Sequence, residues 1–269
     1  MAGEFDNRSP NSVENSNEKK SILSNIGVWT GRLPWNGLFF FVIALMGCTG
    51  GNALAITSFD QEVENSNLNQ NDKTIADYTR AIELDPKDAE AYFYRGVAYA
   101  KLNQNDKAIA DYTRAIELDP KLAAAYNNRG LAYLRLQQFY KAITDYTRAI
   151  ELDPKLAEAY NNRGDAYFSL GQTNKAMTDS NKAIELDPKY VMAYYTRGLA
   201  YGQLKQYDKA IADYNKAIEL DPKYGFPYSS RGETYLKMGR KKEAEADMAK
   251  GMMLAKEAKA DMAKMLKGN

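Results

Sequence analysis

The sequence predicts an all-α solenoid, an array of stacked helix pairs, and its repeats carry that prediction. The hexapeptide AIELDP occurs five times, and each copy starts 34 residues after the one before. Each unit contains two apolar-periodic stretches of about 14 residues, such as 89–102 and 105–118, with apolar spacings of three and four. A unit of this size cannot bury its apolar face alone and must stack on its neighbours. We therefore expect function to lie along a surface rather than in one pocket.

Proline marks the predicted end of each helix pair. In the sequence LDP, proline lacks the N–H that would continue a helix and disfavours the helical conformation of the residue before it. The second helix of each pair is therefore predicted to stop there. These prolines are Pro86, Pro120, Pro154, Pro188 and Pro222.

Within the unit, large and small residues recur at fixed places. Large rings are expected to pack where small residues open space. Tyrosine occupies the fourth position (Tyr92, Tyr126, Tyr160, Tyr194, Tyr228), glycine the eighth (Gly96, Gly130, Gly164, Gly198, Gly232) and tyrosine the eleventh (Tyr99, Tyr133, Tyr167, Tyr201, Tyr235). Alanine recurs in the second stretch (Ala108, Ala142, Ala176, Ala210, Ala244), followed by the bulky Tyr112, Tyr146 and Tyr214.

This pattern of aromatic, glycine, tyrosine, alanine and proline positions resembles the tetratricopeptide repeat. The resemblance implies a right-handed superhelical solenoid of antiparallel helix pairs. Five full repeats are expected at 89–122, 123–156, 157–190, 191–224 and 225–258. Residues 71–88 add the second helix of a half repeat, so the array is predicted over 71–258, with 259–269 as the end of a capping helix.

The composition excludes most familiar catalytic and metal-binding sites. The chain has no histidine and one cysteine, Cys48, which removes imidazole chemistry, Cys/His zinc sites and any intrachain disulfide. Its formal net charge of +1 gives no bulk preference for nucleic acid. We therefore expect no enzymatic activity, no cofactor, no metal and no nucleic-acid partner.

The first 70 residues differ from the array. Residues 1–37 are predicted to form a disordered leader, 38–55 a hydrophobic signal or anchor segment and 56–70 a linker. Leu45-Met46-Gly47-Cys48 resembles the lipobox of bacterial lipoproteins, which implies lipidation at Cys48.

Two other fates of the segment stay open: cleavage after Ala55 at a small-residue site, or retention of residues 35–57 as a weak anchor. Under all three interpretations basic residues precede the segment and acidic residues follow it. The repeats are therefore predicted to be exported. Through the lipid at Cys48 or the retained anchor, the N-terminal segment is predicted to associate them with a membrane.

An arginine at the seventh position and an aspartate sixteen residues later recur in every full repeat. One interpretation is a ladder of anion-binding sites; the other is an internal bidentate pair that fixes how one helix pair sets against the next. The internal pair is favoured, because a uniform motif at matched spacing is what a stacked structure requires.

In tetratricopeptide proteins the first helices line a concave groove, and the second, fifth, ninth, twelfth and thirteenth positions usually face the ligand. Carried over by resemblance, the groove residues are Glu90, Phe93, Val97, Lys101, Asn127, Leu131, Leu134, Arg135, Asn161, Asp165, Phe168, Tyr195, Leu199, Gln203, Phe226, Ser229, Glu233, Leu236 and Lys237. The side-chain chemistry of these positions varies between repeats, whereas that of the core positions does not. Either adaptation to a partner or unselected drift of surface residues would produce this variation.

Two groove positions suggest a contact type. Asn127 and Asn161 are equivalent in adjacent repeats and would each clamp a peptide amide, or else be hydrated asparagines. Phe93 and Val97 stand where chaperone-binding relatives carry lysine and asparagine, so binding of a chaperone tail is not expected.

The sequence therefore predicts a non-enzymatic adaptor that binds a peptide segment or protein domain in its groove. The alternative is a self-assembling spacer that uses the solenoid ends. Six of the ten methionines lie in the last 32 residues, and such a stripe serves either as a docking face or as flexible filler over the last repeat.

Overall fold

A computed structural model of the protein describes residues 71–267, with side chains as far as residue 261. All of these residues belong to one compact unit, Phe59–Asn269. The predicted leader, the hydrophobic segment with Cys48 and the linker lie outside the described residues.

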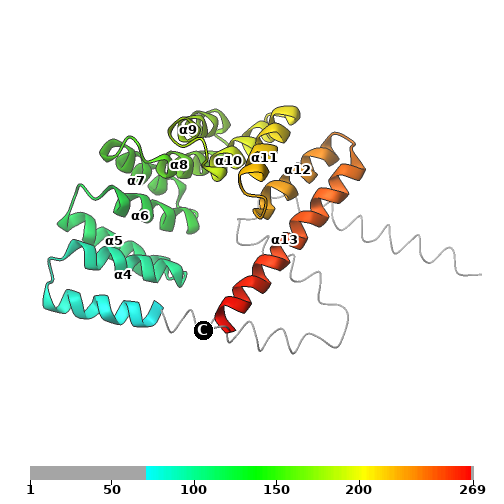
Figure 1. Ribbon diagram of the computed structural model, residues 1–269. Helices are drawn as coiled ribbons and strands as arrows, with labels where there is room; N and C mark the ends of the chain where they lie inside the picture. The colour runs from blue at the N-terminus through cyan, green and yellow to red at the C-terminus, as the bar shows by residue number, and fades with distance from the viewer. Residues whose placement is uncertain (1–70, 268–269) are drawn as a thin grey trace, which may run out of the picture. The chain divides into compact units, whose positions relative to one another are not determined.

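Residues 71–267 form helices joined by short turns, and this part of the chain contains no strand (Figure 1). A helix over residues 71–84 lies where the second helix of the half repeat was predicted. It is followed by α4 (Ala89–Lys101), α5 (Asn105–Leu118), α6 (Ala123–Arg135), α7 (Phe139–Leu152), α8 (Ala157–Ser169), α9 (Thr173–Leu186), α10 (Val191–Gln203), α11 (Tyr207–Leu220), α12 (Gly225–Lys237) and α13 (Lys241–Lys267). The predicted all-α solenoid of helix pairs is confirmed.

The helices pack in the order of the chain. Each first helix packs on the second helix of its own repeat, and each second helix packs on the first helix of the next repeat. The last helix, α13, is 27 residues long and continues past residue 258 without a break. Repeats that contact only their neighbours are what the short sequence period requires.

Aspartate and proline end the second helices as predicted. The helices α5, α7, α9 and α11 stop at a leucine, and the aspartate that follows is extended, with φ −128° and ψ 93° at Asp119. Proline after it enforces that conformation. The same aspartate closes the turn, because Asp119 Oδ1 accepts a hydrogen bond from the Lys121 backbone N–H at 2.9 Å.

The first helices end differently, on one residue in the left-handed conformation. These residues are Asn103, Gln137, Gly171, Lys205 and Gly239, with φ between 57° and 78°. A left-handed residue stops a helix and lets the next backbone N–H groups reach its last carbonyls. The two helices of a repeat therefore fold back on each other within a few residues.

The predicted fit of rings against glycine is confirmed. Tyr146 is fully buried, and a Cβ placed on Gly130 would lie 2.8 Å from its Cε1. The recurring alanines of the second helices, Ala142 among them, are also 0% exposed, so the two helices approach closely. In the third repeat Ser180 replaces the tyrosine, and its Oγ is buried without a hydrogen-bond partner.

Candidate functional site: the inner face of the array

The first helices line the inner face of the array. Neighbouring first helices contact one another: α4 with α6, α6 with α8, α8 with α10 and α10 with α12. From α5 to α13, no second helix contacts the second helix of the next repeat. The first helices therefore lie at the shorter radius, and successive pairs follow a curved path (Figure 1).

Buried arginine–aspartate pairs hold successive repeats in this arrangement. Arg163 on α8 donates from Nε and Nη2 to the two carboxylate oxygens of Asp179 on α9, both at 2.8 Å. Its Nη1 donates to the Thr147 Oγ1 on α7 at 3.1 Å. The guanidinium thus joins both helices of its own repeat to the second helix of the repeat before it. The same pairing occurs at Arg95 with Asp111, Arg129 with Asp145, Arg197 with Asp213 and Arg231 with Asp247.

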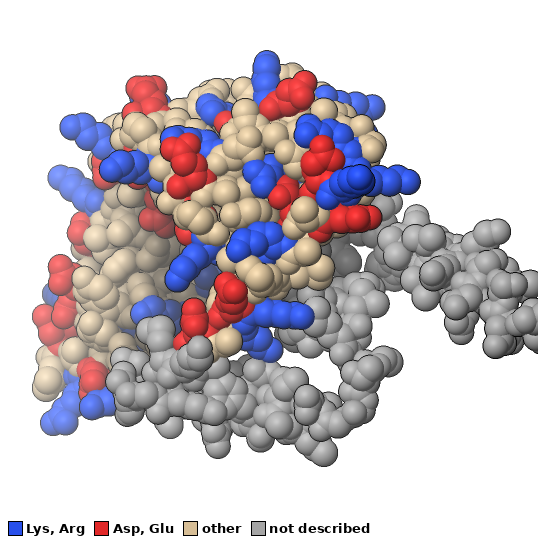
Figure 2. Space-filling view, turned by 45° about the vertical axis from the view of Figure 1, so that its right-hand side comes forward, with Lys and Arg blue, Asp and Glu red and all other residues tan. Residues whose placement is uncertain are grey.

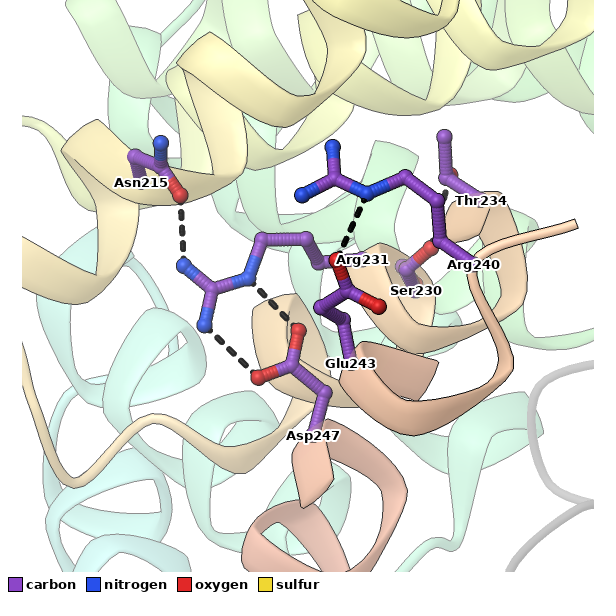
Figure 3. A network of polar contacts seen from close by, with 7 residues as sticks. All are labelled: Asn215, Ser230, Arg231, Thr234, Arg240, Glu243 and Asp247. Atoms are coloured by element: carbon purple, nitrogen blue, oxygen red, sulfur yellow. Dashed lines mark hydrogen bonds and ion pairs between the residues drawn. The ribbon is translucent and has the colours of Figure 1, made fainter. Parts of the chain in front are cut away.

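The last pair is drawn in Figure 3, where Arg231 lies between Asn215 of α11 and Asp247 of α13. The first three arginines donate Nη1 to a threonine, and the last two to an asparagine. Because each guanidinium binds the carboxylate through two nitrogens and this acceptor through a third, the pairs are internal links. The interpretation of the ladder as anion-binding sites is not supported.

Most of the predicted groove residues have some exposed surface. Sixteen of the nineteen are exposed or partly exposed. The other three, Asn127, Asn161 and Tyr195, are 3%, 1% and 5% exposed. All three occupy the fifth position, which is partly exposed in the first repeat, at Phe93, and in the last, at Ser229.

The buried fifth position forms contacts between repeats. Asn162 on α8 donates from Nδ2 to the Asn127 Oδ1 on α6 at 3.2 Å. The Tyr195 hydroxyl lies 3.3 Å from the Ser230 Oγ on α12. Both pairs are 35 residues apart and join the fifth position of one repeat to the sixth of the next. The amide clamp of Asn127 and Asn161 stays a prediction, and in this structure the Asn127 oxygen already has a protein partner.

The ninth position forms a row along the inner face, one residue from each first helix. It holds Val97, Leu131, Asp165, Leu199 and Glu233. The first four are partly exposed and Glu233 is exposed. We call these five residues the ninth-position row. It offers an apolar surface that Asp165 interrupts in the third repeat and that ends at Glu233 in the fifth.

Asp165 is the unusual member of that row. Its Oδ1 is buried and has no hydrogen-bond partner. Burial raises the pKa of its carboxyl to about 6. Since the unfolded pKa is about 3.9, the contribution of this group to stability is fully present below that value and is lost as the pH rises through about 6. At neutral pH the charged form therefore destabilises the fold.

The sequence analysis missed an aromatic cluster beside this row. The Tyr224 ring lies 5.6 Å from the Tyr195 ring and 5.5 Å from the Phe226 ring, centroid to centroid. Tyr224 directly precedes α12, where the second and third repeats carry Leu122 and Leu156 before their first helices. That change from leucine to tyrosine was the available signal.

The described residues provide no obvious site for a metal ion. No group of three or more acidic or cysteine side chains among them is placed to hold one. None of the described helices combines the length and apolarity that crossing a membrane requires. Figure 2 shows acidic and basic side chains scattered among each other over the visible face of the array.

Comparison with known families agrees with this geometry. Three family models described as tetratricopeptide or TPR repeats match the chain. Their matches cover 123–156 and 191–224 for the first, 67–103, 98–137 and 164–205 for the second, and 145–178 and 213–246 for the third. The chain belongs to the tetratricopeptide repeat family. Its repeats provide the fold of a protein–protein interaction scaffold.

The array of this chain is similar in fold to several solved structures. MamA is 30% identical, with a TM-score of 0.52 over 62% of this chain and 96% of its own. A thermophilic TPR protein of Thermus thermophilus, TTC0263, is 25% identical, with a TM-score of 0.57 over 67% and 97%. YrrB, whose structure is described as a TPR protein with an unusual peptide-binding site, is 22% identical, with a TM-score of 0.51 over 71% and 98%. No curated protein sequence matches the chain.

Proposed function

We propose that this protein is a non-enzymatic adaptor that holds a peptide segment or protein domain against the inner face of its tetratricopeptide array. The observation that carries the proposal is the ninth-position row. Its core neighbours repeat almost unchanged, whereas the row varies from valine and leucine to aspartate and glutamate. A row of partly exposed apolar side chains along a curved face suits an extended or helical segment, which would bury them. The peptide-binding site named for YrrB is consistent with such a use of the fold.

A groove variant tests this proposal. Leu131→Gln with Leu199→Gln replaces two apolar side chains of the row by polar ones of similar length. We expect the parent chain to capture a protein from a lysate of the source cells, and the variant to capture at least about fivefold less of it, because apolar contact area is lost at the centre of the interface. Quantitative mass spectrometry of the captured proteins measures the difference.

The matched control carries the same type of change away from the row. Tyr140→Gln alters a side chain that is 72% exposed on the second helix α7. This control should capture as much partner as the parent. Equal capture by the parent and the groove variant would place the interface elsewhere on the array.

We propose further that the adaptor is exported and tethered to a membrane by its N-terminal segment, through a lipid at Cys48. The proposal rests on the lipobox-like sequence before Cys48 and on the position of the only cysteine of the chain. Cell fractionation of the parent and of Cys48→Ser tests it. The parent should sediment with membranes and the variant should be released, whereas a variant that stays with membranes would favour an uncleaved anchor.

The second candidate function is a self-assembling spacer. Met252 and Met253 on α13 are 45% and 41% exposed, and Leu84 is 82% exposed at the end of the helix over 71–84. Exposed apolar side chains near both ends of an array suit end-to-end contact. Capture of further copies of this chain, and of nothing else, would favour the spacer over the adaptor.

A further inference from the structure

We propose that the inner face binds a cationic side chain of the partner, a lysine or an arginine, at Asp165. The inference rests on the proposed function, because it names the chemistry of the segment held in the groove. It is carried by a set of buried polar atoms, one in the second repeat and two in the third, that have no hydrogen-bond partner.

Three polar atoms near one another lack a partner. The Asn161 Oδ1, the Asp165 Oδ1 and the Tyr146 hydroxyl are all buried without a hydrogen bond. Asn161 is only 1% exposed and precedes Asp165 by four residues on α8, which places both on one side of the helix. Burial raises the pKa of Tyr146, and the negative charge of Asp165 raises it further. A buried acceptor without a donor is rare in proteins and calls for an explanation.

The missing group has to be a donor that reaches the inner face. Asp165 is partly exposed as a residue although its Oδ1 is buried, so a side chain from outside can approach the carboxylate. An ammonium or guanidinium group is a donor and carries the opposite charge. Hydrogen bonds between such groups and carboxylates are the strong ones in proteins. A bound water molecule would also donate, but it would not neutralise the charge.

The surrounding charges favour a cation. Besides Asp165, the charges of Glu158 and Glu233 act on tyrosines here, Glu158 on Tyr146 and Glu233 on Tyr195. The cation that acts on Tyr146 is Arg135, whose Nη1 donates to the Ala100 carbonyl oxygen at 3.0 Å. Asp145 also acts on Tyr146, but its carboxylate is bound by Arg129. The other three carboxylates act on this region with one guanidinium, that of Arg135, which bonds to the end of α4.

Aromatic rings lie next to the carboxylate. Burial is the main cause of the raised pKa of Tyr195 and of Tyr224, and the negative charge of Asp165 raises both pKa values further. Lysine and arginine bury their aliphatic stems along apolar surface and are attracted to aromatic faces. A carboxylate with rings beside it therefore suits both the stem and the charged end of such a side chain.

The other repeats show that the fold does not need this aspartate. Val97, Leu131 and Leu199 fill the same place in the first, second and fourth repeats. An apolar residue there would avoid the cost of a buried carboxylate without a partner. A destabilising residue at one place in a groove is what a binding function would maintain.

The experiment selects peptides from a phage-displayed library of random twelve-residue peptides on the full chain. Three proteins are compared: the parent, Asp165→Asn, and Asp208→Asn as a control that removes an exposed aspartate from α11. Circular dichroism and a thermal melt confirm folding, and Asp165→Asn should melt no lower than the parent, since it removes a buried charge.

We expect the parent and the control to select peptides with lysine or arginine at one aligned position, enriched about threefold or more over the library. Asp165→Asn should select peptides without that preference. In a selected peptide, replacing the basic residue by the neutral norleucine should weaken binding to the parent about tenfold and binding to Asp165→Asn less than about twofold.

Each other result overturns the inference in a distinguishable way. Peptides selected without a basic position, or with the same basic position by Asp165→Asn, would remove the cation site and leave the adaptor function standing. Failure of the parent to select any peptide would count against the peptide-binding groove itself, and the cation site would fall with it.

Discussion

Replacing Arg163 by leucine is expected to lower the free energy of unfolding by about 3 kcal/mol, because the change leaves a buried carboxylate without its partner. The side chain of Asp179 is 7% exposed and accepts both of its short hydrogen bonds from this arginine. Asp179→Leu should cost a similar amount, since it leaves the Arg163 guanidinium, 17% exposed, without its carboxylate. Urea denaturation followed by circular dichroism measures both.

The double variant separates pairing from independent contributions. Arg163→Leu with Asp179→Leu removes both charges, so it should cost about 2 kcal/mol less than the sum of the two single changes. A double variant as destabilised as the sum would show that the two side chains act independently. Lys182→Ala provides the control. Its ion pair with Glu185 has side chains 39% and 68% exposed, and the change should cost no more than about 0.5 kcal/mol.

Gly198→Ala is expected to destabilise the array by about 2 kcal/mol through overpacking. The new Cβ would lie 2.6 Å from Cε1 and 2.8 Å from Cδ1 of Tyr214, whose ring is 2% exposed and has little room to move. This cost exceeds the gain of about 1 kcal/mol that alanine normally brings over glycine inside a helix.

The control lies four residues further along the same helix. Gly202→Ala would place its Cβ 3.7 Å from the Tyr214 hydroxyl oxygen, which is an ordinary contact. We expect it to stabilise the array by up to about 1 kcal/mol. Thermal and urea melts of the two variants should therefore shift in opposite directions. A stabilising Gly198→Ala would mean that the close fit of ring against glycine contributes nothing.

Both predictions concern features that the sequence alone indicated. The spacing of sixteen residues between Arg163 and Asp179 predicted an internal pair, and the structure confirms it with two hydrogen bonds. The alternation of glycine with tyrosine predicted rings packed against open backbone. These features lie inside one repeat, where helix geometry and turn length fix which side chains meet.

Contacts between neighbouring repeats were harder to predict. The fifth position was expected to face a ligand, yet Asn127 lies inside the array and accepts a hydrogen bond from Asn162 of the next repeat. The assignment came from resemblance to related proteins. Whether this position is buried depends on the side chain that the following repeat presents to it, which the pattern of one repeat does not specify.

The sequence by itself determined the period, the helix pairs, their endings at proline and the pairs within each repeat, because all of these are local and recur. The tertiary structure alone decided which inner-face residues keep exposed surface and which polar groups lack partners. Asp165 illustrates the difference: in the sequence it is one more aspartate on a helix. Its buried oxygen and raised pKa arise only where neighbouring repeats exclude water from it.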